Sequence, residues 1–181
     1  MYILGIETSC DETSCAVLEL TATRAKLRAH QVLSQVKDHT PYGGVVPELA
    51  ARRHAENIIP LLHRTLAKAQ TTPAKLDLLA VTQGPGLITA LQIGVETART
   101  LAYGWDKPLI GVNHITGHLL SPFLDNPGWK LMRTARTWPA VALVVSGGHT
   151  ELYLMRSPLI WKLLGKTVDD AVGEAFDKVG K

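Results

Sequence analysis

Segments of strand length and helix length alternate through the middle of this chain. Residues 76–83 (LDLLAVTQ) and 107–114 (KPLIGVNH) are near-continuous apolar runs, which is typical of buried strands. Helical periodicity begins near Pro47, a residue favoured at the first position of a helix. Residues 84–105 place a glycine turn and a second helix between the two strands. This alternation predicts an α/β layer structure in which helices cover a mixed sheet.

Two further segments have the form of a β-hairpin with a small, polar tip. Residues 2–7 (YILGIE) and 14–20 (SCAVLEL) are apolar and flank the first tip, and a β-like segment follows at 25–36. Residues 138–155 repeat the form, with a Gly-Gly turn between two apolar strands. We therefore expect the second hairpin to echo the first. A further helix is expected around GEAFDKVGK, at residues 173–181.

Composition excludes several classes of protein. A hydrophobic content of 46% with 19% charged residues is typical of a globular chain. The net charge of +3 allows contact with nucleic acid but does not argue for it. Two cysteines are too few for a disulfide framework, which favours a reducing compartment. No run approaches the roughly 18 apolar residues of a membrane span, and the first residues lack the basic region of a signal peptide, so we expect a cytoplasmic location without membrane contact.

The polar tips of the two hairpins are candidate anion sites. Short side chains at residues 5–13 (GIETSCDET) would leave backbone N–H groups open to a phosphate, although an ordinary hairpin tip has the same composition. In residues 144–150 (VVSGGHT) the two glycines permit unusual dihedral angles and close approach, and Ser146 and Thr150 add hydroxyl groups. A plain turn explains this segment equally well. For the glycine turn at 84–86, a tight strand-to-helix turn is favoured over an anion site.

His114 and His118 are one helical turn apart, so their side chains can project side by side. Such a pair is more often a surface or core feature than a metal site. Its position directly after a buried strand and the small Gly117 between the histidines favour a ligand role. Zinc and iron sites usually have at least three protein ligands, so the pair would be an incomplete site. The other histidines show no such pairing.

Two tryptophans flank three basic residues in the segment 129–138 (WKLMRTARTW). Basic residues interleaved with aromatic rings can bind single-stranded nucleic acid. An extended surface excursion between elements explains the segment equally well.

A set of motifs in this chain resembles, in order and in spacing, those of the universal tRNA threonylcarbamoyladenosine synthase family (TsaD), formerly described as O-sialoglycoprotein endopeptidases. The motifs are GIETSCDET, YGGVVPELAARRH, TQGPGL, NHITGHLL, VVSGGHTEL and DDAVGEAFDKV. The resemblance covers essentially the whole chain. It implies the fold of the actin-like, sugar-kinase and heat-shock ATPase (ASKHA) superfamily, in which two duplicated lobes surround a nucleotide cleft. We expect residues 1–137 to form the first lobe and residues 138–181 the start of a truncated second lobe.

The resemblance also implies an activity. Family members transfer the threonylcarbamoyl group of threonylcarbamoyl-adenylate to N6 of the adenosine adjacent to the tRNA anticodon, which makes them acyltransferases. Attack by this amine on the carbamoyl carbon expels adenylate, so no covalent enzyme intermediate is needed, and a metal can serve as template and Lewis acid. The implied partners are tRNA and, in bacteria, a TsaB-like paralogue and a TsaE-like ATPase.

The family's functional residues have matches in this sequence. His114 and His118 match two histidine ligands of one iron or zinc ion. Asp11 and Glu12 match acidic residues that line the cleft near the reaction centre, and Asp177 matches a substrate-binding aspartate. The bound adenine nucleotide would be threonylcarbamoyl-adenylate or ATP. The turn that binds substrate or nucleotide matches Val144, Val145, Ser146, Gly147 and Gly148.

The chain also departs from the family pattern. The family's third metal ligand, an aspartate, and further substrate contacts lie in the second lobe beyond Lys181, so we expect a fragment with weak or no activity alone. The segment around residues 129–138 is longer than expected, and Val179 to Lys181 replace an alanine and a leucine pair. One alternative is a non-catalytic docking lobe like TsaB, against which both retained histidines argue. The other is a metallopeptidase, which would need a glutamate where Ile115 stands.

Overall fold

The computed structural model describes residues 1–124 and 127–180. The chain divides into two compact units, Met1–Gly117 and His118–Lys181. This division falls before residue 137, where we expect the first lobe to end. Compactness alone does not define a duplicated lobe, so that boundary stays a prediction.

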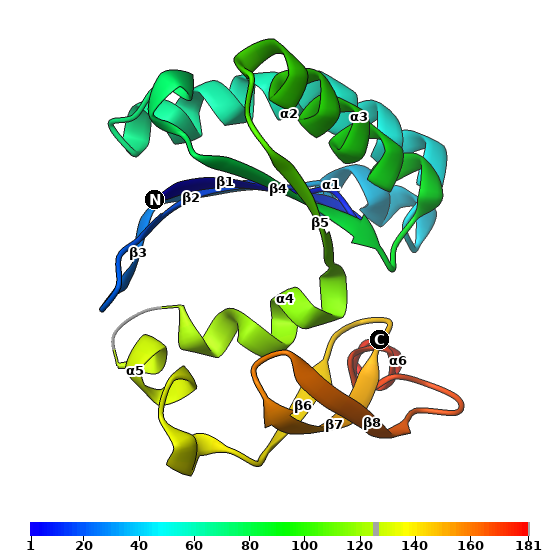
Figure 1. The fold of residues 1–181 in the computed structure, drawn as a ribbon. Helices are drawn as coiled ribbons and strands as arrows, with labels where there is room; N and C mark the ends of the chain where they lie inside the picture. The colour runs from blue at the N-terminus through cyan, green and yellow to red at the C-terminus, as the bar shows by residue number, and fades with distance from the viewer. Residues whose placement is uncertain (125–126, 181) are drawn as a thin grey trace. The chain divides into compact units, whose positions relative to one another are not determined.

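A five-stranded mixed sheet forms the first unit (Figure 1). Its strand order is β3 (Ala25–Ser34), β2 (Glu12–Leu20), β1 (Tyr2–Glu7), β4 (Leu78–Gly84) and β5 (Leu109–Asn113). β1 pairs antiparallel with β2, and β2 with β3, whereas β4 runs parallel to both β1 and β5. The hairpin and the mixed α/β sheet expected from the sequence are therefore confirmed. The burial predicted for residues 107–114 is wrong, because β5 is an edge strand of this sheet and none of its residues is buried.

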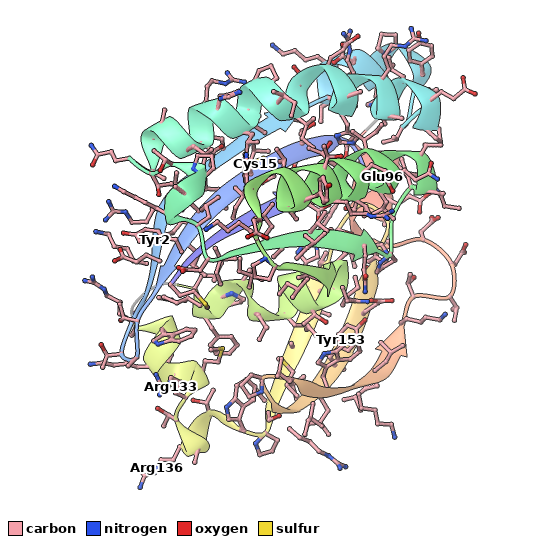
Figure 2. The ribbon with its side chains drawn as sticks, turned by 45° about the horizontal axis from the view of Figure 1, so that its top comes forward. Tyr2, Cys15, Glu96, Arg133, Arg136 and Tyr153 are labelled. Carbon is pink, nitrogen blue, oxygen red and sulfur yellow. The ribbon has the colours of Figure 1, made fainter. Side chains whose placement is uncertain are left out.

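Helices cover one face of this sheet (Figure 1). They are α2 (Pro47–Lys68), which begins at the predicted proline, and α3 (Ile88–Trp105). Alternate residues of the strands point toward these helices, and Cys15 of β2 lies in the core between sheet and helices (Figure 2). Short helical segments connect the strands and helices: α1 (Val36–His39), η1 (Thr40–Tyr42) and η2 (Pro73–Lys75). The core of this unit includes Leu4, Ile6, Cys15, Val17, Ile58, Leu61, Leu62, Leu79, Val81 and Ala98.

The second unit contains a three-stranded antiparallel sheet in the order β6 (Ala140–Val145), β7 (Thr150–Ser157) and β8 (Ile160–Lys166). β6, β7 and β8 are neighbours in chain order, as β1, β2 and β3 are. The similarity to the first hairpin that the sequence predicts therefore includes a third strand. Tyr153 (Figure 2) is buried, and its ring meets that of Trp161 edge-on at 5.3 Å. The last helix of the chain, α6, spans Val172–Val179.

The remaining helical segments lie between β5 and β6. They are α4 (His114–Leu120), η3 (Ser121–Phe123), α5 (Gly128–Met132) and η4 (Ala135–Thr137). Within the residues that the structure describes, no helix is both long enough and apolar enough to cross a membrane.

Candidate functional site

The first hairpin tip, Thr8–Asp11, joins β1 to β2 and is held by α3. The Thr8 hydroxyl donates to the Ala90 carbonyl oxygen over 2.9 Å, and both Thr8 and Ser9 are buried. The Leu87 backbone N–H donates to the Ser9 carbonyl oxygen at 2.8 Å. Two polar groups of the tip are thus paired with the first turn of a helix that lies far along the chain.

Two glycines allow this close approach. A Cβ at Gly94 would lie 2.3 Å from the Thr8 hydroxyl oxygen, and one at Gly86 would lie 2.5 Å from the Ser9 carbonyl oxygen. Either distance is far below van der Waals contact, so a larger side chain would displace the tip. The glycine turn at 84–86 therefore packs against the hairpin, in agreement with the favoured structural interpretation.

Glu7, the last residue of β1, is the most densely hydrogen-bonded carboxylate near this tip. Its Oε1 accepts from the Ser9 backbone N–H, and its Oε2 accepts from the Thr82 hydroxyl at 2.6 Å. The same Oε2 lies 3.0 Å from Nδ1 of His114. Burial alone raises the pKa of such a carboxyl group, but the hydrogen bonds from His114, Ser9 and Thr82 outweigh it and lower the pKa of Glu7 to about 2. Glu7 is therefore ionised throughout the neutral range.

An ionised carboxylate can only accept, so Nδ1 of His114 carries the proton that it donates to Glu7. In the neutral ring the lone pair then lies on Nε2. Histidines that bind metals usually donate their other ring N–H to such a carboxylate, which fixes the ring and raises its basicity. The sequence did not single out Glu7, because its contacts with Thr82 and His114 join residues 75 and 107 positions apart.

His114 and His118 lie on the same short helix, α4, one turn apart. This confirms the helical placement that the spacing predicts; their role as metal ligands stays a prediction. Among the described residues, no group of three or more His, Cys, Asp and Glu side chains is arranged to hold a metal ion.

The two acidic candidates lie at the end of the first tip. Asp11 is half-buried, and its carbonyl oxygen accepts from the Gln35 backbone N–H at 2.9 Å. Glu12 is exposed and begins β2. Partial burial, and next the negative charge of Asp11, raise the pKa of the exposed Cys10 thiol to about 11. This cysteine is consequently protonated at neutral pH and is a poor nucleophile.

The second hairpin tip, Ser146–His149, joins β6 to β7. The Ser146 backbone N–H donates to the His149 carbonyl oxygen at 2.8 Å, and the His149 N–H donates to the Ser146 hydroxyl at 3.1 Å. Gly147 and Gly148 are exposed, and a Cβ on either would meet no atom within 4 Å. Neither has a positive φ, so the turn does not use the unusual dihedral angles that its two glycines permit. Of the other residues matched to this turn, Val144 is buried and Val145 is exposed.

Helix α6 packs against the second tip. The Val172 backbone N–H donates to the Thr150 hydroxyl at 2.7 Å. A Cβ at Gly173 would lie 2.7 Å from the Ser146 carbonyl oxygen and 2.9 Å from the Cα of Gly147, so Gly173 is the residue that lets α6 approach the backbone of the tip closely. Asp177 belongs to α6, but its side chain lies outside the described residues.

The segment 129–138 folds as α5 and η4 rather than as an extended excursion. The indole N–H of Trp138 donates to the Met132 carbonyl oxygen at 2.9 Å, and the guanidinium of Arg133 lies 6.0 Å from the ring centre of Trp129. Arg133 and Arg136 both belong to this segment (Figure 2). Nucleic-acid contact by these residues stays a prediction.

Comparisons with known proteins agree with the motifs. The family model of tRNA N6-adenosine threonylcarbamoyltransferase (TsaD) matches residues 26–181. A tRNA N6-adenosine threonylcarbamoyltransferase of Thermomicrobium roseum is 50% identical over 181 residues, which are all of this chain and 48% of that protein. One from onion yellows phytoplasma is 48% identical over 181 residues, again all of this chain and 73% of that protein. The chain thus spans about half the length of the first of these relatives.

The fold has a counterpart among solved structures. YeaZ from Pseudomonas aeruginosa superposes with a TM-score of 0.51 at 20% sequence identity, covering 92% of this chain and 68% of that one. At this level of identity the similarity concerns the fold alone.

Proposed function

Because the chain belongs to the tRNA N6-adenosine threonylcarbamoyltransferase family, we propose that it acts in the transfer of a threonylcarbamoyl group from threonylcarbamoyl-adenylate to N6 of the adenosine adjacent to the tRNA anticodon. The chain spans 48% of the T. roseum relative, so the activity and the tRNA substrate are both part of this proposal. The TsaB-like and TsaE-like partners and a cytoplasmic location belong to it as well.

The contact between Glu7 and His114 is the observation that carries this proposal. The carboxylate holds Nδ1 of the ring at 3.0 Å, and the Thr82 hydroxyl holds the same carboxylate oxygen at 2.6 Å. Imidazole donors suit both iron and zinc, and a carboxylate behind the ring is the usual support for a ligand histidine. His114 and His118 would therefore hold the ion, which when bound would supply a Lewis acid and a template for the acyl group.

The second tip supplies groups that suit a phosphate. Its two glycines are exposed, with open space where side chains would otherwise stand. Backbone N–H groups in such a turn, together with the Ser146 hydroxyl, can donate to phosphate oxygens. We assign the adenylate phosphate to Val144, Val145, Ser146, Gly147 and Gly148, and a substrate contact to Asp177.

Asp11 and Glu12 are assigned to the acceptor amine. In the reaction, N6 bonds to the carbamoyl carbon, the bond from that carbon to the phosphate oxygen breaks, and adenylate leaves. The amine also loses a proton, which a carboxylate positioned beside it can accept. Asp11 and Glu12 carry such carboxylates at the end of the first tip.

The test is formation of threonylcarbamoyladenosine on unmodified tRNA, measured by mass spectrometry of the digested nucleosides. The reaction contains this chain, threonylcarbamoyl-adenylate, iron or zinc, and the two partner proteins. We expect product with the wild type and none with a His114→Ala, His118→Ala double variant. The control is His63→Ala, which removes an exposed histidine of α2.

Equal product from the double variant and the wild type would overturn the metal assignment. A complete reaction without product would reject the enzyme activity for this chain and support the docking-lobe alternative.

A further inference from the structure

A buried histidine lies on α2, directly beneath the first hairpin tip. His54 is fully buried, with Nε2 at 2.9 Å from the Cys10 carbonyl oxygen and Nδ1 at 2.7 Å from the Thr13 hydroxyl. A carbonyl oxygen only accepts, so Nε2 carries the proton and donates to Cys10. Nδ1 then accepts from the Thr13 hydroxyl. Both ring nitrogens are thereby committed to the chain segment that contains the tip.

Gln35 and His39 extend this network. The Val46 backbone N–H donates to Nδ1 of His39 at 3.3 Å, so Nε2 of His39 donates to the Gln35 side-chain oxygen at 3.1 Å. The Gln35 side-chain nitrogen lies 3.4 Å from both the Ala50 carbonyl oxygen and Nδ1 of His54. The Val46 N–H thus fixes which ring nitrogen of His39 accepts, and the Cys10 carbonyl fixes which ring nitrogen of His54 donates. The sequence, in which these histidines lie 15 positions apart, showed no such pairing.

The network holds the main chain on both sides of Asp11 and Glu12. His54 holds the carbonyl of Cys10, the Gln35 N–H holds the carbonyl of Asp11 at 2.9 Å, and Thr13 follows Glu12 directly. A buried polar network rigidifies its surroundings, whereas an apolar side chain in place of His54 would leave the Cys10 carbonyl oxygen without this partner. The two acidic residues consequently project from backbone that is held at each end.

We propose that His54 is a positioning residue for the transfer reaction: by hydrogen bonding to Cys10 and Thr13, it fixes the backbone that presents Asp11 and Glu12. This inference rests on the proposed function, since it takes those two carboxylates to act on the acceptor amine. His54 itself touches no reacting atom and acts through the tip.

The chain contains its own probe of the tip. Cys10 and Cys15 are its two cysteines; Cys10 is exposed in the tip, and Cys15 is wholly buried in the core. Partial burial and the charge of Asp11 hold the pKa of the Cys10 thiol at about 11, so loosening of the tip should speed its alkylation by iodoacetamide. Opening of the core would expose Cys15 to the same reagent, and mass spectrometry distinguishes the two sites. We compare His54→Leu, which fills the site without hydrogen bonds, with His54→Gln, whose side-chain amide can still donate to Cys10.

With His54→Leu we expect Cys10 alkylation to rise by about fivefold while Cys15 stays protected, because a lost hydrogen bond opens the tip locally. In the complete transfer reaction we expect kcat to fall by about tenfold with little change in KM for the adenylate. His54→Gln should restore most of both values. If His54→Leu does not fold, Thr13→Val replaces it as a smaller change in the same network. Its Cys10 alkylation should rise, and its kcat should fall, by less than we expect for His54→Leu.

The matched control is Thr65→Val. Thr65 is equally buried on α2, but its hydroxyl donates to the Leu61 carbonyl oxygen within the helix, away from the tip's hydrogen bonds to His54. Thr65→Val should leave the Cys10 alkylation rate, kcat and KM for the adenylate unchanged even if it lowers the free energy of unfolding.

Wild-type alkylation of Cys10 in both His54→Leu and Thr13→Val would overturn the inference. The inference would also be overturned if His54→Gln failed to restore the alkylation rate and the kcat that His54→Leu changes. The shape of the imidazole ring, rather than its hydrogen bond to Cys10, would then be what the tip requires. Absence of product with every variant and the wild type would reject the proposed function, while the alkylation rates would still decide the role of His54 in holding the tip.

Discussion

The two hairpin tips resemble each other in sequence, but their surroundings differ. In the first tip, Thr8 and Ser9 are buried, and their polar groups bond to α3 and to Glu7. In the second, Gly147 and Gly148 are exposed with no atom near the position of a Cβ. The first tip is therefore defined by the fold of its own unit, whereas the glycines of the second are not required by the packing of theirs. Small and polar residues are tied to neighbouring elements in the first tip, whereas the two glycines of the second leave open space around them.

The largest effect should come from filling the close approach at the first tip. Gly94→Val would place a Cβ 2.3 Å from the Thr8 hydroxyl, and overpacking of this kind destabilises by about 3 kcal/mol. Urea unfolding measures the change. Gly104→Val on the same helix, where a Cβ meets nothing within 4 Å, should stay within about 0.5 kcal/mol of the wild type. Equal losses at both positions would show that the tip is not tightly held.

Glu7→Gln tests the support of His114. The amide keeps the volume but removes the charge that orients Nδ1, so zinc affinity should fall by about 10- to 100-fold. Competition with a chromophoric chelator measures it. Glu96→Gln, on the exposed face of α3 (Figure 2), is the control and should bind zinc as the wild type does. Unchanged zinc affinity in Glu7→Gln would show that Glu7 does not support a metal-binding role of His114.

A pair of substitutions sharpens the contrast at the second tip. Gly173→Ala should destabilise by about 1 to 2 kcal/mol, because its Cβ would meet the Ser146 carbonyl oxygen at 2.7 Å. Gly148→Ala should change stability by less than about 0.5 kcal/mol, since the space is open, yet weaken binding of threonylcarbamoyl-adenylate. Calorimetry gives both quantities. If Gly148→Ala binds the adenylate normally, the open turn is not the phosphate site.

The smallest effect should be a pH dependence of the free energy of unfolding, caused by the buried His54. Burial lowers the pKa of His54 below its usual 6.5, although the bond to Cys10 and the charges of Glu7 and Asp11 oppose this. At a pH between the two pKa values, His54 is therefore protonated in the unfolded chain and neutral in the folded chain. This part of the stability is complete above the unfolded pKa and is lost as the pH falls below it. Between about pH 7 and about pH 5, the free energy of unfolding should decrease more for the wild type than for His54→Gln, as urea titrations can show. Parallel slopes would contradict a buried neutral ring.

Much of the fold could be predicted from local patterns. The hairpin of β1 and β2, the start of α2 at Pro47 and the burial of β4 follow from apolar periodicity and from the residue preferences of helix ends. β8 was missed, because most of its residues, among them Lys162 and Leu164, are exposed and show no alternation. The helical form of the segment 129–138 was missed as well, since its short turns are too brief for a periodic signal.

For the candidate site too, local features could be read from the sequence, whereas long-range contacts could not. The sequence alone determined the motifs, the one-turn spacing of His114 and His118, and the acidic pair Asp11 and Glu12, because each lies within a few residues of chain. Only the tertiary structure decided that Glu7 supports His114 and that His54 lies beneath the first tip. Those contacts join residues 107 and 44 positions apart, and the packing of the helices on the sheet, rather than any local preference, brings them within hydrogen-bonding distance.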